Sequence, residues 1–394
     1  MNIKELAKGV EQNVIRWRRH LHTIPEPGID VPETANYVCG VLDELGIQYK
    51  RGVGLPDAIV GTIVGKQPGK TIALRADMDA LPVVEETGLD FASTNGNMHA
   101  CGHDAHTSIL LGAAQVLNEN KESFNGTIKL LFQPGEEISK GAEPMIEDGA
   151  LEGVDYILGM HVGNISGESA PGEVLVNTGS MMACLDNFNA TITGVGSHGA
   201  YPHESIDPIS ATGYVLTALQ EIISREINPV DPGVITIGKV QAGTAYNVIP
   251  GKSYLEGTAR AVNQKSREYL ARRIGEVIEG VSSAFRCKVD YTYNFEAPPL
   301  VNDEKVALSV FESAKKVIDP ARVKIMKNPV MGGEDFACYL EKVPGNFLFM
   351  ANPLPIDGEI YPHHNSRFAL DEKYFVDGVA IFVQSTLDLL EKNE

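Results

Sequence analysis

Short apolar runs alternate with amphipathic segments over the first part of the chain and again toward its end. The runs are short and nearly continuous, as is typical of strands that are buried on both faces. They lie at 57–65, 71–77, 127–135, 156–162 and 346–353. Segments such as 108–120 repeat apolar residues at the spacing of a helix. This alternation predicts an α/β domain with a mostly parallel sheet covered by helices.

A different order of elements begins near Leu185. A strand is followed by a helix, two strands, a second helix and a last strand, at 188–196, 209–226, 233–243, 253–262, 266–285 and 288–295. This βαββαβ order is that of a ferredoxin-like unit. The stretch at 297–299 then returns the chain to elements that would complete the first sheet. We therefore predict a discontinuous first domain over 1–184 and 297–394, with a satellite domain inserted at 185–296.

The composition and charge of the chain favour some classes of protein over others. The 394 residues are 43% hydrophobic and 22% charged, which suits a folded protein with two domains. The formal net charge of -19 argues against nucleic acid or an anionic membrane surface as a partner. Residues 1–22 carry a helical apolar stripe rather than the core of a signal peptide, and we find no run of about 18 apolar residues that would span a membrane.

The cysteines point to a reducing compartment. They are five in number, which is odd, and they are scattered along the chain at 39, 101, 184, 287 and 338. Such a set does not form a disulfide framework. We expect a cytoplasmic protein in which Cys39, Cys184, Cys287 and Cys338 are ordinary apolar residues.

Residues with metal-binding side chains cluster in the segment MHACGHDAHTS, at 98–108. Cys101 and His103 lie two apart in a Gly-containing loop just before a helix. Glu136 and Glu137 follow one predicted strand, and His161 ends another. Because ligands bind at the carboxyl ends of strands in an open α/β sheet, we expect these side chains to converge.

Two later histidines, His363 and His364, follow the strand at 346–353 and could reach the same edge. A thiolate, imidazoles and carboxylates together are the ligand set of zinc or a similar divalent transition metal. Each of these candidate residues, taken alone, has an ordinary explanation: the cysteine could simply be buried, and the acidic pair could be a solvated helix start. Their convergence favours a metal site. His99 and His106 are assigned a supporting or structural place, because one site cannot use every histidine.

Ten segments occur in a fixed order along the chain: RRHLHTIPEPG, LRADMDALPVVEETG, MHACGHDAHTS, LLFQPGEE, GMHV, GSHGAYPH, GTAYNVIP, GTARA, GGEDFA and HHNSRF. Together they resemble the amidohydrolase branch of the aminoacylase and carboxypeptidase family of two-metal hydrolases. This branch includes hippurate hydrolases, N-acyl-amino-acid and N-acetyl-diaminopimelate amidohydrolases, and plant auxin-conjugate hydrolases. The resemblance extends over nearly the whole chain and is specific for the family, not for one substrate.

The resemblance implies a metal-binding catalytic domain with Glu136 as general base. The implied ligands of two divalent ions (Zn, Mn, Co or Ni) are Cys101, His103, Glu137, His161 and His364. It favours His364 over His363, because the ligand of the family stands three places before an Arg or similar residue, here Arg367.

One segment departs from the wider family. Where that family carries His-x-Asp, this chain reads Asp77-Met78-Asp79. The departure fits the branch in which Cys101 helps to hold the metals. Asp79 is expected to orient a ligand, and the role of Asp77 stays open.

The chemistry implied by this resemblance is hydrolysis of an N-acyl amino acid. Two metal ions polarise the amide carbonyl and lower the pKa of a bridging water, and Glu136 transfers the proton of that water to the leaving amine. The inserted domain would supply His198 as a donor to the oxyanion, with Asn247 and Arg260 holding the substrate carboxylate. His198 has the alternative of stabilising its turn, and Arg260 that of a surface cation. The inserted domain would also act as a lid and pair with a second copy in a homodimer.

Three alternatives remain at this point. A metal-binding protein without catalysis would not need Glu136 beside the ligands. A hydrolase with Cys101 as nucleophile would leave Glu137 and His161 unexplained. A metallo-dipeptidase or carboxypeptidase of the same family is the second choice, because the sequence does not define the acyl pocket. The acyl group, the amino acid and the native metal are likewise undefined by sequence.

Overall fold

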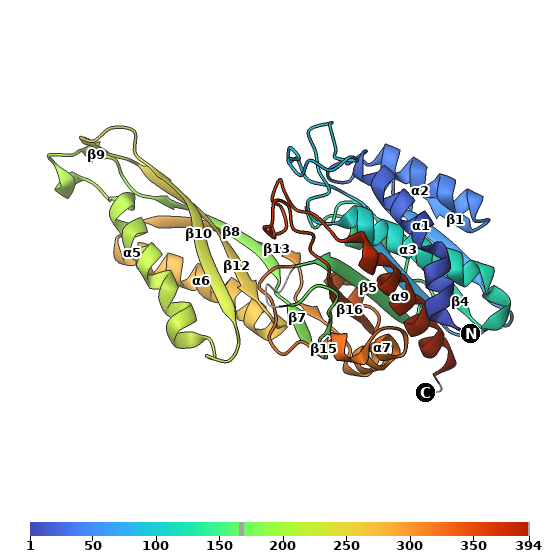
Figure 1. Ribbon diagram of the computed structural model, residues 1–394. Helices are drawn as coiled ribbons and strands as arrows, with labels where there is room; N and C mark the ends of the chain where they lie inside the picture. The colour runs from blue at the N-terminus through green and yellow to red at the C-terminus, as the bar shows by residue number, and fades with distance from the viewer. Residues whose placement is uncertain (165–168, 393–394) are drawn as a thin grey trace. The chain divides into compact units, whose positions relative to one another are not determined.

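The computed structural model describes residues 1–164 and 169–392, and the chain forms two compact units (Figure 1). Unit 1 comprises Met1–Gly179, Val301–Asn328 and Asp335–Glu394, and unit 2 comprises Ser180–Leu300 and Pro329–Glu334. Segment 329–334 falls within the first domain as that domain is predicted from the sequence. In the structure this segment bonds to the start of unit 2, since Val330 donates its N–H to the Met181 carbonyl at 2.9 Å and accepts from Ala183 at 3.1 Å.

Unit 1 is built on an eight-stranded sheet. Its strands, in spatial order, are β1 (Gln48–Arg51), β2 (Ile59–Val64), β4 (Thr127–Gln133), β3 (Thr71–Asp77), β5 (Tyr156–Gly163), β16 (Gly345–Ala351), β6 (Val174–Val176) and β15 (Val323–Ile325). The four central strands, from β4 to β16, run parallel. The predicted α/β fold with a mostly parallel sheet is confirmed.

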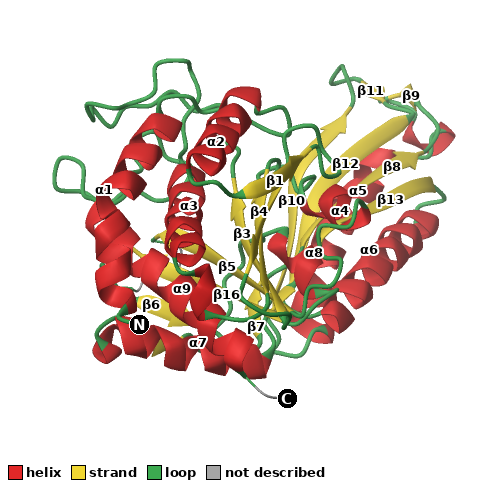
Figure 2. Ribbon diagram, turned by 90° about the vertical axis from the view of Figure 1, so that its right-hand side faces the viewer, coloured by secondary structure: helices red, strands yellow, loops and turns green. Residues whose placement is uncertain are grey.

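Helices cover both faces of this sheet (Figure 2). One face carries α1 (Ile3–His22), α2 (Pro32–Glu44), α3 (His103–Glu119), α7 (Glu304–Val317) and α9 (Phe375–Glu391). The other carries the short helices α4 (Ala142–Glu147) and α8 (Phe336–Leu340). The apolar stripe predicted for the first helix is buried, with Val14 at 0% and Trp17 at 2% exposure. Helix α3 is buried along most of its length, which fixes the start of that helix firmly against the sheet.

Unit 2 has the predicted βαββαβ order. The order comprises β8 (Leu185–Thr193), α5 (Pro208–Glu221), β10 (Gly233–Ala242), β12 (Lys252–Ala261), α6 (Gln264–Ala284) and β13 (Lys288–Ala297). The four strands form an antiparallel sheet in the order β10-β12-β8-β13. Alternate residues of β8 are buried, because one face of the sheet packs on α5 and α6. A π-helical turn, Ile222–Glu226, extends α5.

Several short elements complete the chain. They are β7 (Ser180–Met182) paired with β14 (Leu300–Val301), β9 (Ser197–His198) paired with β11 (Val248–Ile249), and 3-10 turns at Lys121–Ser123, Pro202–Glu204, Pro320–Arg322 and Glu372–Tyr374. Within 1–164 and 169–392, no helix is both long and apolar enough to cross a membrane.

Candidate metal centre

The candidate ligands of unit 1 lie at the carboxyl ends of three neighbouring strands. Strand β3 ends at Asp77 and is followed by the long loop that leads to Cys101 and His103. Glu136 and Glu137 follow β4 after a short turn, and His161 lies near the end of β5. Strands β4, β3 and β5 are adjacent and parallel, so their carboxyl ends meet at one edge of the sheet. Topology therefore brings together groups that are far apart in sequence.

Two glycines shape the loops that carry these groups. Gly102, between Cys101 and His103, has φ 94°, and a Cβ there would lie 3.1 Å from side-chain atoms of Leu370 and Val162. Gly135, before the acidic pair, has φ 79°, and a Cβ there would lie 2.7 Å from Ile29. Other residues rarely adopt such a backbone conformation. The glycines thus allow tight turns that direct the ligand side chains toward the sheet edge.

The five predicted ligands form one cluster. Cys101 Sγ lies 3.4 Å from His161 Nε2, and His364 Nε2 lies 3.3 Å from Glu137 Oε2. His103 Nε2 lies 3.9 Å from Glu137 Oε1. The donor atoms of Cys101, His103 and His161 lie within 4.8 Å of one another, as do those of Cys101, Glu137 and His364. Cys101 belongs to both groups, and such a shared group suits two adjacent ions.

Asp79 contacts three members of this site: His103, Glu136 and Glu137. Its backbone carbonyl lies 2.9 Å from His103 Nδ1, and its Oδ1 lies 3.4 Å from the same nitrogen. Its two carboxylate oxygens accept the backbone N–H groups of Glu136 and Glu137, each at 3.1 Å. The Nδ1 contact leaves His103 Nε2 facing the cluster, so Asp79 orients both an imidazole and the acidic pair.

The residues present fit a metal ion. His103 Nε2 and Glu137 Oε1 are buried, and neither has a hydrogen-bond partner among the described residues. Burying a polar atom without a partner costs about 1–3 kcal/mol, and more for a charged group. A divalent cation would satisfy both atoms. The mixed set of thiol, imidazole and carboxylate is also one that zinc and similar transition metals bind.

The electrostatics of the cluster also favour a cation. Burial raises the pKa of the Cys101 thiol well above its usual range, and the carboxylates of Glu137 and Glu136 raise it further. Burial lowers the pKa of His103, but Asp77, Asp79 and Glu137 outweigh burial and raise that pKa to about 10. The carboxylates thus create a strongly negative field at the site. A bound cation would offset that field and stabilise the Cys101 thiolate.

His363 and His364 both reach the cluster. His363 Nδ1 lies 3.8 Å from Cys101 Sγ, but its Nε2 accepts the Asn164 N–H at 3.1 Å. Burial lowers the pKa of His363 to about 3. His364 has φ 67°, and its N–H donates to the Ala100 carbonyl at 2.9 Å. Because His363 Nε2 accepts a hydrogen bond, the proton of its neutral ring is on Nδ1, the nitrogen that faces Cys101, and that nitrogen cannot bind a metal ion. His364 Nε2 is directed at Glu137, so the geometry favours His364 over His363 as the candidate ligand.

A second buried group lies behind the ligands and was not singled out from the sequence. Arg75 on β3 is 1% exposed and donates to Asp77 Oδ2 at 2.7 Å and to Asp335 Oδ1 at 2.8 Å. Gln133 also donates to Asp335, at 2.8 Å. An arginine within a strand predicted to be buried is itself a signal, because buried charges are normally paired.

The candidate residues of unit 2 lie on its exposed surface. His198 is on β9, and its Nδ1 accepts the Ala200 N–H at 3.1 Å. In the neutral ring the proton is therefore on Nε2, which is available as a donor. Asn247 is exposed and accepts the Gly199 N–H at 2.8 Å through its carbonyl, which places it beside His198. The turn predicted as the alternative role of His198 is thus present, and it also fixes the ring tautomer.

Arg260 lies on β12, apart from these two residues in unit 2, and is half-buried. Its Nη1 donates to the Asp186 carbonyl at 3.2 Å and to the Ala259 carbonyl at 3.1 Å, and it also contacts the Thr258 hydroxyl. In the described part of the chain these partners are neutral oxygens. A half-buried guanidinium with neutral partners retains its charge for an anionic ligand.

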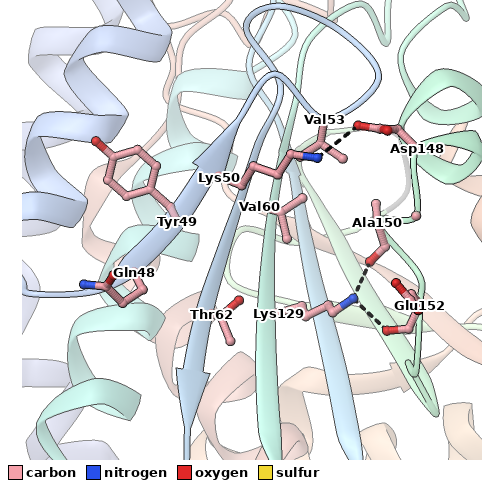
Figure 3. A pocket seen from close by; sticks show the side chains of 11 residues that line it. Gln48, Tyr49, Lys50, Val53, Val60, Thr62, Lys129, Asp148, Ala150 and Glu152 are labelled. Atoms are coloured by element: carbon pink, nitrogen blue, oxygen red, sulfur yellow. Dashed lines mark hydrogen bonds and ion pairs between the residues drawn. The ribbon is translucent and has the colours of Figure 1, made fainter.

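A pocket of about 350 Å³ lies elsewhere on unit 1, over β1, β2 and β4 (Figure 3). Figure 3 shows Lys50 directed at Asp148, with Nζ and Oδ2 3.4 Å apart, and Lys129 directed at the backbone carbonyls of Ala150 and Glu152. Both lysines are paired within the pocket wall. None of the predicted site residues lines it, so this pocket is distinct from the metal centre.

Fold and site together define the class of a metal-dependent hydrolase, in which candidate metal ligands and an acid meet at the carboxyl edge of an α/β sheet. Residues 73–388 match the model of Peptidase family M20/M25/M40, and the chain belongs to this family. The resemblance noted from the sequence is thereby confirmed.

Three relatives show the extent of the similarity. The chain is 41% identical over 390 residues to N-acetyl-L-cysteine deacetylase of Bacillus subtilis (strain 168), covering 98% of this chain and 90% of that protein. It is 40% identical over 377 residues to thermostable carboxypeptidase 1 of Saccharolobus solfataricus, covering 94% and 93%. A solved Bacillus subtilis structure described as a dinuclear metal binding peptidase from the M20 family has a TM-score of 0.86 and 32% identity, covering 98% of this chain and 100% of that one.

Proposed function

We propose that this protein hydrolyses the amide bond of N-acyl amino acids, releasing a carboxylate and a free amino acid, with two divalent metal ions bound per subunit. The observation that carries the proposal is the pair of buried atoms, His103 Nε2 and Glu137 Oε1, that face one cluster without a hydrogen-bond partner among the described residues. An acid, Glu136, stands beside that cluster, 3.8 Å from His103 Nε2. The similarity to an N-acetyl-L-cysteine deacetylase supports the substrate class.

The metal ions would be held by the cluster already described, whose members are Cys101, His103, Glu137, His161 and His364. When bound, the ions supply Lewis acidity that polarises the amide carbonyl and lowers the pKa of a water. Zn, Mn, Co and Ni all suit this donor set, so the supply of metal in the cell would decide much of the native content.

Glu136 is the proposed general base. Its backbone N–H is held by Asp79, and the residue is 8% exposed. It would take a proton from the attacking water and deliver it to the nitrogen of the leaving amine, which must be protonated to depart. Its neighbour Glu137 cannot do this while its oxygens hold metal.

Unit 2 would supply the substrate contacts. His198, with its proton on Nε2, would donate to the carbonyl oxygen as negative charge develops there. Asn247 and Arg260 are the two candidates for holding the free carboxylate of the substrate, and a guanidinium offers a planar fork that matches carboxylate geometry. Because the two residues lie apart in unit 2, they would not hold the same carboxylate from one subunit. These roles assign catalysis to unit 1 and recognition to unit 2, which would act as the lid.

A homodimer through unit 2 is part of the proposal. Strand β10 is at the edge of the sheet of unit 2, and edge strands present unpaired backbone groups that a second chain can use. A cytoplasmic location is proposed because the cysteines are odd in number and scattered along the chain, and all five are buried. The proposed partners are thus a small substrate and a second copy of the chain, with no role for nucleic acid or membrane.

The deciding experiment is metal removal followed by reconstitution. The chelator-treated protein is expected to lose all hydrolysis of N-acetyl and N-benzoyl amino acids, and added Mn, Zn, Co or Ni should restore it. Full activity in rigorously metal-free protein would overturn the proposal and favour Cys101 as nucleophile. Restored metal binding without any hydrolysis would favour a metal-binding protein without catalysis.

A carboxypeptidase or dipeptidase is the second candidate, favoured by the similarity to thermostable carboxypeptidase 1. The two functions differ in the group that precedes the scissile bond. A reconstituted screen should therefore include acetyl, benzoyl and indoleacetyl amino acids beside dipeptides and longer peptides. Higher kcat/KM on the peptides would identify the second candidate.

A further inference from the structure

The last residues of β5 lose their strand partner on one side. Pairing between β3 and β5 runs from Ile72 opposite Tyr156 to Arg75 opposite Gly159. Beyond that point β3 stays paired with β4, as far as Asp77 opposite Gln133, while β5 continues beside β16 to Gly163. The edge of β5 that faces β3 is therefore open just where it carries His161.

A side chain from α3 takes the place of the missing strand. His106 Nε2 accepts the Val162 N–H at 2.9 Å, and Val162 is 0% exposed. A buried N–H group without a partner is rare and costly, so this bond completes the hydrogen bonding of β5 at its end. His106 thus holds the backbone directly after His161.

The orientation of His106 is fixed from its other side. Because Nε2 accepts a hydrogen bond, the proton of the neutral ring is on Nδ1, which donates to Asp77 Oδ1 at 2.5 Å. Asp77 Oδ2 accepts from Arg75 Nη1 at 2.7 Å. All three side chains are at most 3% exposed. Arg75, Asp77 and His106 form a continuous buried chain that ends on the backbone of β5.

The same backbone residue sets the imidazole of His161. The Val162 carbonyl accepts from His161 Nδ1 at 2.8 Å, which leaves His161 Nε2 directed at Cys101 Sγ, 3.4 Å away. Both polar backbone groups of Val162 are therefore used, one by His106 and one by His161. A shift of Val162 would turn the His161 ring away from Cys101.

We propose that Arg75, Asp77 and His106 are positioning residues that set the orientation of the His161 imidazole at the metal centre. This inference rests on the proposed function in that it takes His161 as a metal ligand. It gives Asp77 a role that its sequence position left open. Although Asp77, His103 and His106 lie close enough to hold an ion, both nitrogens of His106 and both oxygens of Asp77 already have partners, so this trio is a support and not a third metal site.

The test uses the full-length protein, cobalt(II) as the probe, and three variants. His106→Leu removes both bonds, Asp77→Asn weakens the hold on His106, and His106→Gln keeps one acceptor and one donor. The measurements are cobalt affinity by competition with a chelator, the absorption spectrum of the cobalt-loaded protein, and backbone hydrogen exchange over 156–163 in the metal-free protein.

His106→Leu and Asp77→Asn are expected to weaken cobalt binding about 10- to 100-fold, the usual effect of losing a group that orients a ligand, and to change the ligand-field bands. Exchange over 156–163 should be faster in the metal-free variants. His106→Gln should lose less affinity than His106→Leu. If His106→Leu does not fold, Asp77→Asn and His106→Gln are compared with the parent protein in the same measurements.

Asn302 offers a matched control in unit 1. It is 4% exposed, accepts the Phe347 N–H at 2.7 Å and donates to the Phe347 carbonyl at 2.9 Å, so it also holds a strand backbone, but on β16. Asn302→Ala should lower the unfolding midpoint and leave the cobalt spectrum and affinity unchanged. A merely structural role for His106 predicts the same pattern as this control.

The outcomes separate this inference from the proposed function. Parental cobalt affinity, spectrum and exchange in His106→Leu would overturn the positioning role, while cobalt-dependent hydrolysis by the parent protein would still support the proposed function. Failure of the parent protein to bind cobalt would overturn both.

Discussion

The candidate functional side chains are mostly buried in unit 1 and exposed at His198 and Asn247 in unit 2. Unit 1 buries Asp77, Asp79 and His103 completely and leaves His161 6% exposed, and these groups surround the candidate metal centre. In unit 2, by contrast, the candidate substrate groups His198 and Asn247 are exposed. Unit 1 thus holds its chemistry in a preformed arrangement, whereas the donors of unit 2 would be removed from water only when substrate covers them.

Burial alone does not mark a functional group, as the buried charge of unit 2 shows. Asp186 is 1% exposed and accepts from Arg267 at 2.9 and 2.7 Å, from the Tyr293 hydroxyl at 2.8 Å and from the Glu296 N–H at 3.1 Å. Its bonding capacity is filled by the protein. In unit 1, His103 Nε2 and Glu137 Oε1 have no such partner among the described residues. The contrast indicates that unmet bonding capacity, rather than burial, distinguishes a site from a structural support.

The acidic pair of unit 1 gives the largest expected effects. Glu137→Gln should lose metal and all turnover, because it removes a ligand charge. Glu136→Gln should keep metal and lower kcat by about two to four orders of magnitude, as expected for a lost general base. Metal analysis and steady-state kinetics on both variants check this. Retained metal in both, with turnover lost only in Glu137→Gln, would reverse the two assignments.

A change at His198 tests the role of the exposed surface of unit 2. His198→Ala should lower kcat by about two to three orders of magnitude with a smaller change in substrate affinity, because the donor acts mainly on the developing negative charge. Metal content should stay at the parental value. Near-normal turnover in a folded, metal-loaded variant would mean that His198 is not an oxyanion donor. Its role would then be to stabilise the turn through its hydrogen bond with the Ala200 N–H.

The buried charge of unit 2 should affect stability and not chemistry. Asp186→Asn leaves Arg267 buried without its ion pair, and we expect a loss of about 3 kcal/mol in unfolding free energy. Urea unfolding followed by circular dichroism measures this loss, and metal content and kcat in the absence of urea serve as controls. Loss of metal from a folded Asp186→Asn protein would contradict the division between the units.

The smallest effect is expected at a surface pair of unit 2. The bidentate bond from Arg273 lowers the pKa of Glu226 to about 2, from an ordinary value of 4.5. A lowered folded-state pKa contributes stability above the unfolded value, and this contribution is lost as pH falls through the folded value. Glu226→Gln should therefore cost about 1 kcal/mol or less at pH 7, and the difference from the parent should shrink below pH 4.5.

A neighbouring pair supplies the control for this measurement. Glu221 and Arg225 are 3.8 Å apart, with side chains 66% and 78% exposed, so Glu221→Gln should leave the unfolding free energy nearly unchanged at every pH. Equal pH dependence in the two variants would show that the Glu226 pair adds nothing specific.

Much of the fold and of the cluster followed from the sequence. Apolar runs alternating with helical stripes specified the α/β sheet, because periodicity records which face of an element is buried. The βαββαβ order specified unit 2. Cys101, His103 and His161 could be expected to meet because each lies near the carboxyl end of a strand or in a loop at that edge of the sheet, and parallel neighbours share that edge.

What the sequence left open depended on contacts between distant residues. Arg75 pairs with Asp335 across 260 positions, and Asp77 pairs with His106 across 29. No local pattern encodes such partners, because they are selected by packing once the strands and helices are assembled. The choice between His363 and His364 is similar, since it depends on which ring the Asn164 backbone engages. The sequence determined which elements form and where their ends meet; only the tertiary structure decided which buried groups satisfy one another and which are left to bind a ligand.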